Sequence, residues 1–234
     1  MKTRHFAQLL LLSALWGASF LFLRMASPVL GPMVLAGGRV ALATLTLVLI
    51  MRLLRQAWPW AHWRELLLLG ALSVALPFLL YAWAALRLPS GYSALLNTTA
   101  VLFGTLASSW FGEDTLTRRK LLGCLCGFAG VALIVQLGPV QPDASTVAAA
   151  LACLGASACY GFSTPLMKRA TTRMQPLAIA AGLHLGALVL VARAEVWTLP
   201  QAQFTPVAVG AMLVLGIVTS GLAYWMHLRI IRNV

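Results

Sequence analysis

Acidic side chains are scarce in this protein, and charged side chains of either sign are few. Only five residues are Asp or Glu against 17 Lys or Arg, and 9% of the 234 residues are charged while 61% are hydrophobic. An ordinary soluble domain carries about 25% charged and roughly 45–50% apolar residues. So few polar side chains cannot cover the surface of a soluble domain. The composition therefore excludes a soluble globular protein and indicates an integral membrane protein.

The sequence also lacks the motifs of ATP-driven pumps and of membrane enzymes. It contains no Walker-type glycine-rich loop, no G-x-S-x-G, no H-E-x-x-H and no pair of carboxylates within an apolar run. Without a nucleotide site, the driving force of any transport must come from an ion or solute gradient. Without a reactive constellation at membrane depth, we expect the protein not to be an enzyme.

The four cysteines do not form a metal-binding pattern. Cys124, Cys126, Cys153 and Cys159 all lie in apolar runs, with no C-x-x-C pair and no His or carboxylate at ligand spacing. Thiols in such runs behave as small packing residues. We therefore expect neither a metal nor another cofactor.

Long apolar runs, separated by short loops with Pro and Gly, divide the chain into membrane spans. A helix needs roughly 20 apolar residues to cross about 30 Å of hydrocarbon, and spans are helical because lipid offers no partner to open backbone groups. The first run reads as an uncleaved span because no cleavage site precedes polar sequence. Eight helices are expected, at Phe6–Leu23, Pro32–Met51, Glu65–Leu86, Ser90–Phe111, Lys120–Leu137, Thr146–Met167, Pro176–Ala192 and Thr205–Leu228.

The net charge of +12 comes from basic clusters between these runs. Such clusters are typical of membrane orientation signals, so we expect no nucleic-acid partner. If the N-terminus is cytoplasmic, three basic residues lie next to the external ends of expected spans: Arg24, Arg87 and Arg193. Arg39 lies within a span. This bias predicts an inner (cytoplasmic) membrane protein with both termini in the cytoplasm. The thirteen basic residues on the cytoplasmic side are Lys2, Arg4, Arg52, Arg55, Arg64, Arg118, Arg119, Lys120, Lys168, Arg169, Arg173, Arg229 and Arg232.

The two halves of the chain resemble each other. An offset of 144 residues aligns residues 13–17 (SALWG) with 157–161 (SACYG), and a two-residue gap then aligns Ser73 with Thr219. The first unit, residues 1–137, contains five expected helices, and the second, residues 145–234, contains three. Because five is odd, the second unit enters the membrane from the opposite side. We therefore expect two inverted five-helix repeats, the second incomplete.

Several segments carry a family resemblance. Residues 14–20 (ALWGASF) lie in the first helix, Arg39 follows early in the second, and residues 111–117 (FGEDTLT) lead into residues 127–134 (GFAGVALI). With these segments the chain resembles the EamA-type permeases of the drug/metabolite transporter superfamily. The resemblance implies a ten-helix carrier of two inverted repeats that moves small organic solutes, often outward, by alternating access around a central cavity.

Two features depart from the family pattern. Residues 94–100 include Asn97, Thr98 and Thr99 where the family has an apolar run with a proline, and the last two helices are absent. An open cavity wall would expose this polar stretch to lipid. We therefore expect a truncated product, or a dimer or partner that supplies the missing pair.

The sequence thus predicts an all-α polytopic membrane helix bundle that acts as a secondary transporter, an exporter of small organic metabolites or drugs. A non-transporting fragment or an assembly or regulatory protein is the alternative, and a polytopic membrane enzyme is a further one. The expected partners are a small organic solute, the lipid bilayer and a coupling proton.

Polar and aromatic side chains within spans are the candidate substrate ligands. Because an unpaired cation in lipid is costly, Arg39 is either a ligand for an anionic group or a structural residue that binds backbone carbonyls or extends toward the membrane interface. Asn97 and Thr98 either line the cavity or bond neighbouring helices. Aromatic residues away from the helix ends suit apolar or cationic substrates, although helix packing explains them equally: Trp16, Tyr81, Trp83, Tyr160 and Tyr224.

Three titratable side chains are candidates for gating or coupling. Glu113 closes the fourth helix next to the basic residues 118–120. It is part of a proton relay, a salt-bridged gate or only an orientation signal. His184 and His227 are the only histidines within expected spans. Each is either a proton carrier or a hydrogen-bonded structural residue.

Overall fold

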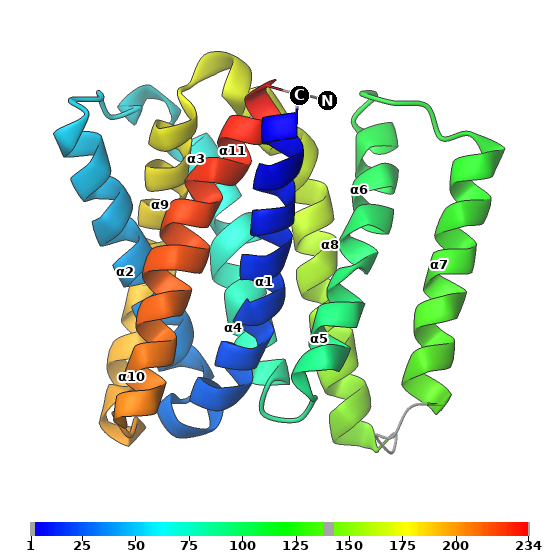
Figure 1. The fold of residues 1–234 in the computed structure, drawn as a ribbon, viewed down its shortest axis with the longest axis horizontal. Coiled ribbons are helices and arrows are strands. Elements are labelled where there is room, and N and C mark those ends of the chain that lie inside the picture. The colour runs from blue at the N-terminus through cyan, green and yellow to red at the C-terminus, as the bar shows by residue number, and fades with distance from the viewer. Residues whose placement is uncertain (1–2, 138–142, 234) are drawn as a thin grey trace.

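The computed structural model describes residues 3–137 and 143–233, and within these residues every regular element is a helix. The helices form eight columns that run side by side (Figure 1). Five columns are single helices: α1 (Thr3–Leu30), α2 (Pro32–Leu53), α7 (Arg118–Leu137), α8 (Ala144–Arg173) and α9 (Pro176–Thr198). Three are composite: α3 (Trp63–Gly70) with η2 (Ala71–Ala75) and α4 (Leu76–Ala84); α5 (Ser90–Asn97) with α6 (Thr99–Trp110); and α10 (Pro206–Leu213) with η4 (Val214–Leu222) and α11 (Ala223–Asn233). Two short 3₁₀ turns lie next to these columns: η1 (Trp60–His62) precedes α3, and η3 (Leu199–Gln201) follows α9.

The columns have the length and composition of membrane spans. In the described part of the chain, five stretches are long and apolar enough to cross a membrane, and Pro176–Ala192 is a shorter apolar helix. The prediction of an all-α polytopic membrane bundle is therefore confirmed. The five stretches are Phe6–Leu30, Pro32–Leu53, Trp60–Ala84, Ala144–Arg173 and Pro206–Arg232.

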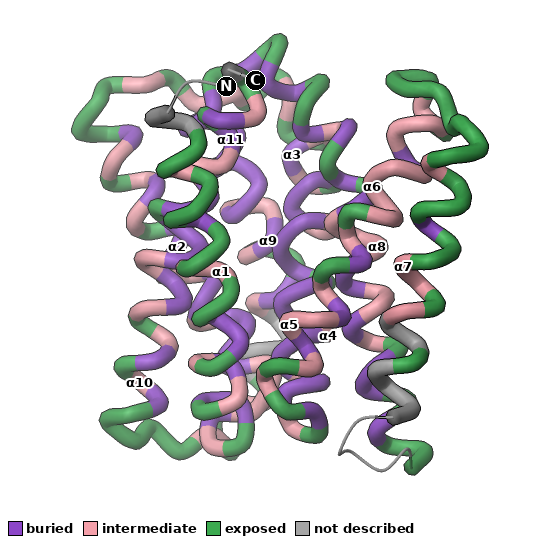
Figure 2. Tube along the Cα trace, turned by 45° about the vertical axis from the view of Figure 1, so that its right-hand side comes forward, coloured by how far each residue is buried: buried purple, intermediate pink, exposed green. Residues whose placement is uncertain are grey.

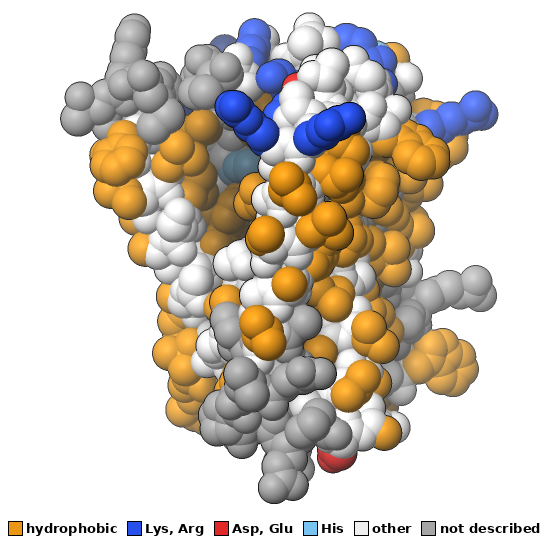
Figure 3. Space-filling view, turned by 90° about the vertical axis from the view of Figure 1, so that its right-hand side faces the viewer, with side chains coloured by type: hydrophobic (Ala, Val, Ile, Leu, Met, Phe, Trp, Pro, Cys, Tyr) orange, Lys and Arg blue, Asp and Glu red, His pale blue; other side chains and the backbone are white. Residues whose placement is uncertain are grey.

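Both ends of the described chain, Thr3 and Asn233, lie at the same end of the bundle (Figure 1). We call it the terminal end. Lys and Arg side chains gather there in the view of Figure 3, while hydrophobic side chains cover the middle of that face. Large apolar side chains such as Leu45 and Leu49 are 66% and 56% exposed. Such an apolar surface suits contact with lipid tails and not with water.

The helices differ in how far they are buried. The larger core cluster joins residues of α2, α3, α4, α8, α9 and α11. By contrast, α7 stands at the edge of the bundle and is largely exposed (Figure 2). It meets α6 through the rings of Phe103 and Phe128, whose centres are 5.2 Å apart.

A glycine allows α8 to approach α6 closely. A Cβ atom at Gly161 would lie 2.5 Å from the Cβ of Phe103 and 2.6 Å from the backbone nitrogen of Gly104. No side chain fits into that space. Small residues at such crossings are a usual device for packing helices in membranes.

Candidate functional site

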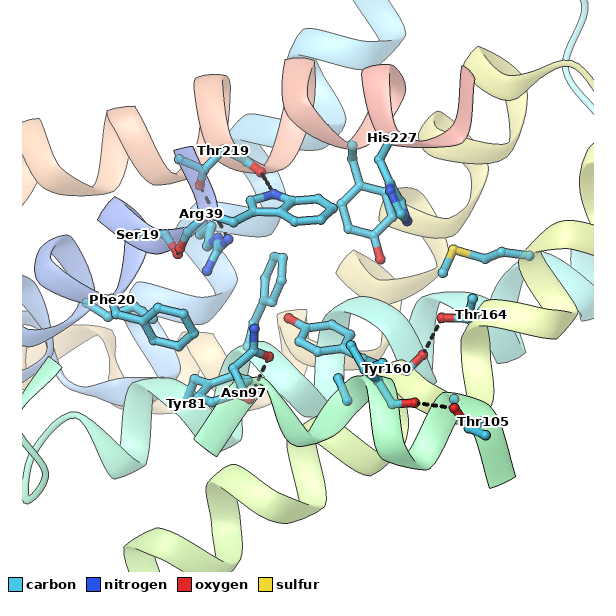
Figure 4. Close-up of a pocket in the computed structure, with 18 of the residues that line it drawn as sticks. Ser19, Phe20, Arg39, Tyr81, Asn97, Thr105, Tyr160, Thr164, Thr219 and His227 are labelled. Carbon is cyan, nitrogen blue, oxygen red and sulfur yellow. Dashed lines mark hydrogen bonds between the residues drawn. The ribbon is translucent and has the colours of Figure 1, made fainter. Parts of the chain in front are cut away.

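A central cavity of about 540 Å³ lies among the columns. Its wall is formed by residues of α1, α2, α4, α5, α6, α8, η4 and α11, many of which are drawn in Figure 4. The cavity extends to Asp114 in the loop after α6. The structure brings seven of the predicted site residues together in this wall: Trp16, Arg39, Tyr81, Asn97, Tyr160, Tyr224 and His227.

Arg39 is a buried cation of the cavity wall, with only 5% of its surface exposed. Its Nε donates to the hydroxyl of Ser220 at 2.6 Å, and its Nη2 donates to the hydroxyl of Thr219 at 3.4 Å. None of the ion pairs within the described residues includes Arg39. Because a guanidinium has five N–H donors, the named bonds leave donors for an anionic group in the cavity.

Two π-helical segments, η2 and η4, offer backbone carbonyls to side chains of the cavity. Within η4 the carbonyl of Thr219 accepts from the indole nitrogen of Trp16 at 3.0 Å. Within η2 the carbonyl of Ser73 accepts from the hydroxyl of Tyr224 at 2.8 Å. π-helical turns change the regular i to i−4 ladder and occur frequently at functional sites. These bonds fix the two aromatic rings in the wall.

Tyr81 organises the side of the cavity formed by α4, α5 and α8. Its hydroxyl donates to the amide oxygen of Asn97 at 2.8 Å and lies 2.9 Å from the hydroxyl of Ser157. Its ring stacks near Tyr160, with centres 6.2 Å apart, and meets the ring of Phe20 edge to face at 5.2 Å. The polar stretch of the fourth column thus places Asn97 at the cavity, where α5 ends.

The rings of both predicted histidines lie near the ring of Tyr224. The ring of His227 lines the cavity, with its centre 5.0 Å from that of Trp16 and 6.1 Å from that of Tyr224. His184 is fully buried outside the cavity, with its ring centre 5.0 Å from Tyr224. Its Nδ1 lies 2.9 Å from the carbonyl of Ala180, and its Nε2 has no hydrogen-bond partner among the described residues.

Two carboxylates stand at the terminal end, and one of them, Asp114, lines the cavity. Glu113 pairs with Arg169 on α8, with 2.6 Å between Oε1 and Nε. Asp114 accepts from Lys120 at 2.5 Å and from the backbone N–H of Thr115 at 2.7 Å. These bonds, that of Lys120 above all, hold the pKa of Asp114 below its usual value. Each of the two carboxylates is therefore paired with a basic side chain.

Two predicted substrate ligands lie outside the cavity. The guanidinium carbon of Arg87 lies 4.2 Å from the centre of a ring of Trp83, near the end of α4. Thr98 is exposed, and its hydroxyl donates to the carbonyl of Leu95 at 2.7 Å, at the junction of α5 and α6. Neither side chain lines the cavity.

Other wall residues were not predicted from the sequence. Phe20, Phe78 and Met167 are apolar residues within apolar runs, so no local signal separates them from lipid-facing neighbours. Thr219 did carry a signal, because the repeat aligns it with Ser73. Those two residues supply the carbonyls that hold Trp16 and Tyr224.

Comparison with known proteins agrees with this architecture. The profile of the EamA-like transporter family matches residues 6–136. The uncharacterized transporter YvbV of Bacillus subtilis (strain 168) is 28% identical over 81% of this chain and 62% of its own length, and protein PecM of Dickeya dadantii (strain 3937) is 29% identical over 66% of this chain and 50% of its own length. The chain thus spans less than two thirds of either relative. A solved protein crystal structure, 16% identical, shares the fold with a TM-score of 0.72, over 99% of this chain and 80% of its own.

Proposed function

Because the chain belongs to the EamA-like transporter family, we propose that it is a secondary transporter that moves a small organic solute across the cytoplasmic membrane by alternating access. The central cavity carries this proposal. Its volume of about 540 Å³ lies within the range of small-molecule sites, roughly 300–1,000 Å³. Its wall combines aromatic rings with a few polar groups, which is the usual composition of such sites. A carrier of this kind catalyses no covalent step.

The cavity favours an organic anion with a flat apolar part. Arg39 supplies a positive charge without a carboxylate partner among the described residues. Trp16, Tyr81 and Tyr160 supply aromatic surface in the cavity wall. Guanidinium groups bind carboxylate, sulfonate or phosphate oxygens through charge-assisted hydrogen bonds, and the rings suit a planar partner.

We propose export as the direction, with the terminal end in the cytoplasm. The excess of basic residues next to this end supports the orientation. The cavity reaches Asp114 at the same end, so this conformation would be open to the cytoplasm. Reporter fusions after Arg55, Lys120 and Arg173 should all report a cytoplasmic position, and an external position of the fusion at Lys120 would contradict the proposed orientation.

We propose that access alternates through movement of two inverted repeats, residues 1–137 and 145–234. The third column of each unit contains a π-helical segment, η2 in one and η4 in the other. The aligned residues Ser73 and Thr219 both use their carbonyls to hold an aromatic residue of the wall. This correspondence supports a common design of the two units, which would rock against each other around the cavity.

We propose that further helices, from a longer chain or a second copy, complete the cavity wall. Val101 lines the cavity and yet is 73% exposed, and α1 presents Leu10 and Leu11 with more than half of their surface exposed. The longer relatives are consistent with additional helices.

Flux of a defined anion tests the function. Vesicles reconstituted with the completed protein, as a dimer or with the additional helices, and loaded with benzenesulfonate, which is permanently anionic, should release it in a saturable manner. Vesicles that contain only the monomeric chain should not. The neutral isostere benzenesulfonamide should show no saturable release. Arg39→Gln should weaken the apparent affinity roughly tenfold or more, since a hydrogen bond to a charged group contributes about 1.5–3 kcal/mol. Arg39→Lys, which keeps the charge, should lose less, and Arg119→Gln at an exposed site should behave as wild type.

Two results would count against this function. Equal release of benzenesulfonate and benzenesulfonamide would remove the role of Arg39 in selecting an anion. Absence of saturable flux for every solute in a wider panel, from protein that unfolds cooperatively, would favour the alternative of a non-transporting assembly or regulatory protein.

A further inference from the structure

A second cavity, of about 500 Å³, lies at the terminal end and shares no lining residue with the central one. It forms where α2 has just ended, where α9 begins and where the last turns of α11 pass (Figure 1). Its position at the end of three columns places it at the level where lipid headgroups meet protein. Its lining residues are Gln56, Gln175, Pro176, Leu177, Trp225, Arg229 and Arg232.

Two cations face this cavity. Arg229 and Arg232 are three residues apart on α11, so they share one face of the helix. Arg232 donates to the amide oxygen of Gln175 at 2.5 Å, and the guanidinium carbon of Arg229 lies 5.7 Å from a ring centre of Trp225. Neither arginine belongs to an ion pair in the part of the chain that the structure describes. The cavity is therefore positive and has no carboxylate among its lining residues.

Besides the two arginines, the side chain of Gln56 lines this cavity. The backbone N–H of Gln56 donates to the carbonyl of Met51 at 3.0 Å, and that of Arg55 donates to the carbonyl of Arg52 at 3.1 Å. These two bonds, with Arg55 in the left-handed region at φ 52°, form a Schellman cap that ends α2 and turns Gln56 inward. The amide oxygen of Gln56 is buried and has no hydrogen-bond partner among the described residues. An acceptor in this state needs a donor from a bound molecule, either a water or a ligand.

We propose that this cavity binds the phosphoglycerol group. Two arginines bind the phosphate oxygens through charge-assisted hydrogen bonds, and the N-terminal end of α9, which begins at Pro176, adds a positive dipole end. A glycerol hydroxyl supplies the donor that Gln56 lacks. The group can come from the headgroup of phosphatidylglycerol or from free glycerol phosphate. Basic pockets between helices on the cytoplasmic side are a known type of lipid headgroup site, and Trp225 suits the membrane interface. This site does not rest on the transport function.

Native mass spectrometry and thermal unfolding of the purified chain test the proposal. Phosphatidylglycerol should remain bound and raise the Tm, while phosphatidylethanolamine of the same acyl chains should not. The double variant R229Q/R232Q should weaken phosphatidylglycerol binding about tenfold or more, since each cation near the surface contributes about 1 kcal/mol. The variant R118Q/R119Q removes two charges at exposed sites of the same end and should bind as wild type.

A second variant keeps the test decisive if R229Q/R232Q folds poorly. Gln56→Glu keeps the shape of the side chain and places a carboxylate beside the arginines, so it should preserve the Tm and abolish phosphatidylglycerol binding. Free glycerol phosphate separates the two sources. If phosphatidylglycerol binds and free glycerol phosphate competes with it, the lipid is supported as the bound form. If free glycerol phosphate binds and phosphatidylglycerol does not, a soluble ligand is supported. Equal retention of phosphatidylglycerol and phosphatidylethanolamine, or unchanged retention in Gln56→Glu, would overturn the proposal.

Discussion

The guanidinium carbon of Arg39 on α2 lies 3.7 Å from the centre of the Phe78 ring on α4. A cation over an aromatic face gains about 2 kcal/mol when it is desolvated, which offsets part of the cost of a charge at membrane depth. Both residues line the central cavity. The ring therefore holds the cation at the cavity and keeps it from extending toward the membrane surface.

Removal of the Phe78 ring should weaken anion binding while leaving the charge in place. For Phe78→Leu we expect the affinity for benzenesulfonate to fall roughly tenfold, because about 1–2 kcal/mol of positioning energy is lost. Equilibrium binding to the purified protein measures this. Phe162→Leu changes an exposed phenylalanine of α8 in the same way and should have no effect. Equal affinities of the two variants would contradict the role of the ring.

The crossing of α6 and α8 should be sensitive to a single methyl group. In Gly161→Ala the new Cβ would collide with the backbone of Gly104 and the Cβ of Phe103, neither of which can rotate away. We expect a loss of about 1–3 kcal/mol of stability, measured by denaturant unfolding in detergent. Gly123→Ala, whose Cβ would meet no atom within 4 Å, is the matched control and should be neutral.

Asp143 should make the start of α8 sensitive to pH. Its carboxylate accepts from the backbone N–H of Thr146 at 2.7 Å, and this bond, above the others, lowers the pKa of Asp143. Since the pKa is lowered on folding, the stabilisation is fully present above the usual value, about 3.9, and is lost as the pH falls through the lowered pKa. Hydrogen exchange of the first amides of α8 should therefore accelerate in acid. In Asp143→Asn, which still caps, this acid dependence should disappear.

The expected spans agree with the observed columns because their signal is strong. Continuous apolar runs and Pro or Gly in the loops give α2 its start at Pro32 and α9 its start at Pro176. The burial of Arg39 among polar groups also follows from its charge. Which face of a helix points to the cavity is harder to predict, since lipid tails are as apolar as the protein interior and leave no amphipathic pattern.

The π-helical segments explain part of what could not be predicted. Each π turn adds a residue to the helical turn and so rotates every later side chain relative to a regular helix. The direction of Tyr224, which follows η4, therefore cannot be derived from a period of 3.6 residues. Likewise, the junction between α5 and α6 at Thr98 separates Asn97, which lines the cavity, from Thr98, which does not.

The ion pair between Glu113 and Arg169 should act as a gate contact and not as a proton relay. Both side chains are partly exposed, so Glu113→Gln should cost less than about 1 kcal/mol of stability and leave the pH dependence of benzenesulfonate flux unchanged. The maximal rate of flux should change instead. Exchange of the charges in the double variant E113R/R169E should restore the rate more fully than either single change. A flux that loses its pH dependence in Glu113→Gln would favour the relay.

His227 is the group that we propose to carry the coupling proton. It lines the cavity beside Trp16 and Tyr224, in the same wall that holds Arg39. Protonation of its imidazole would add a second positive charge to this cavity. An organic anion would bind more tightly to that state, and by reciprocity the bound anion would raise the proton affinity of the site. The structure places no described carboxylate within ion-pair distance of the ring to oppose this effect.

The affinity for benzenesulfonate should therefore increase several-fold once the pH is low enough to protonate the buried imidazole of His227. In His227→Gln the affinity should be independent of pH and close to the wild-type value at pH 8, because the amide keeps the polarity of the ring but cannot be charged. Calorimetric titration at a series of pH values measures both. His62→Gln, at a loop histidine that lies 3.7 Å from Glu65, should keep the full pH dependence. Persistence of that dependence in His227→Gln would assign the proton to another group.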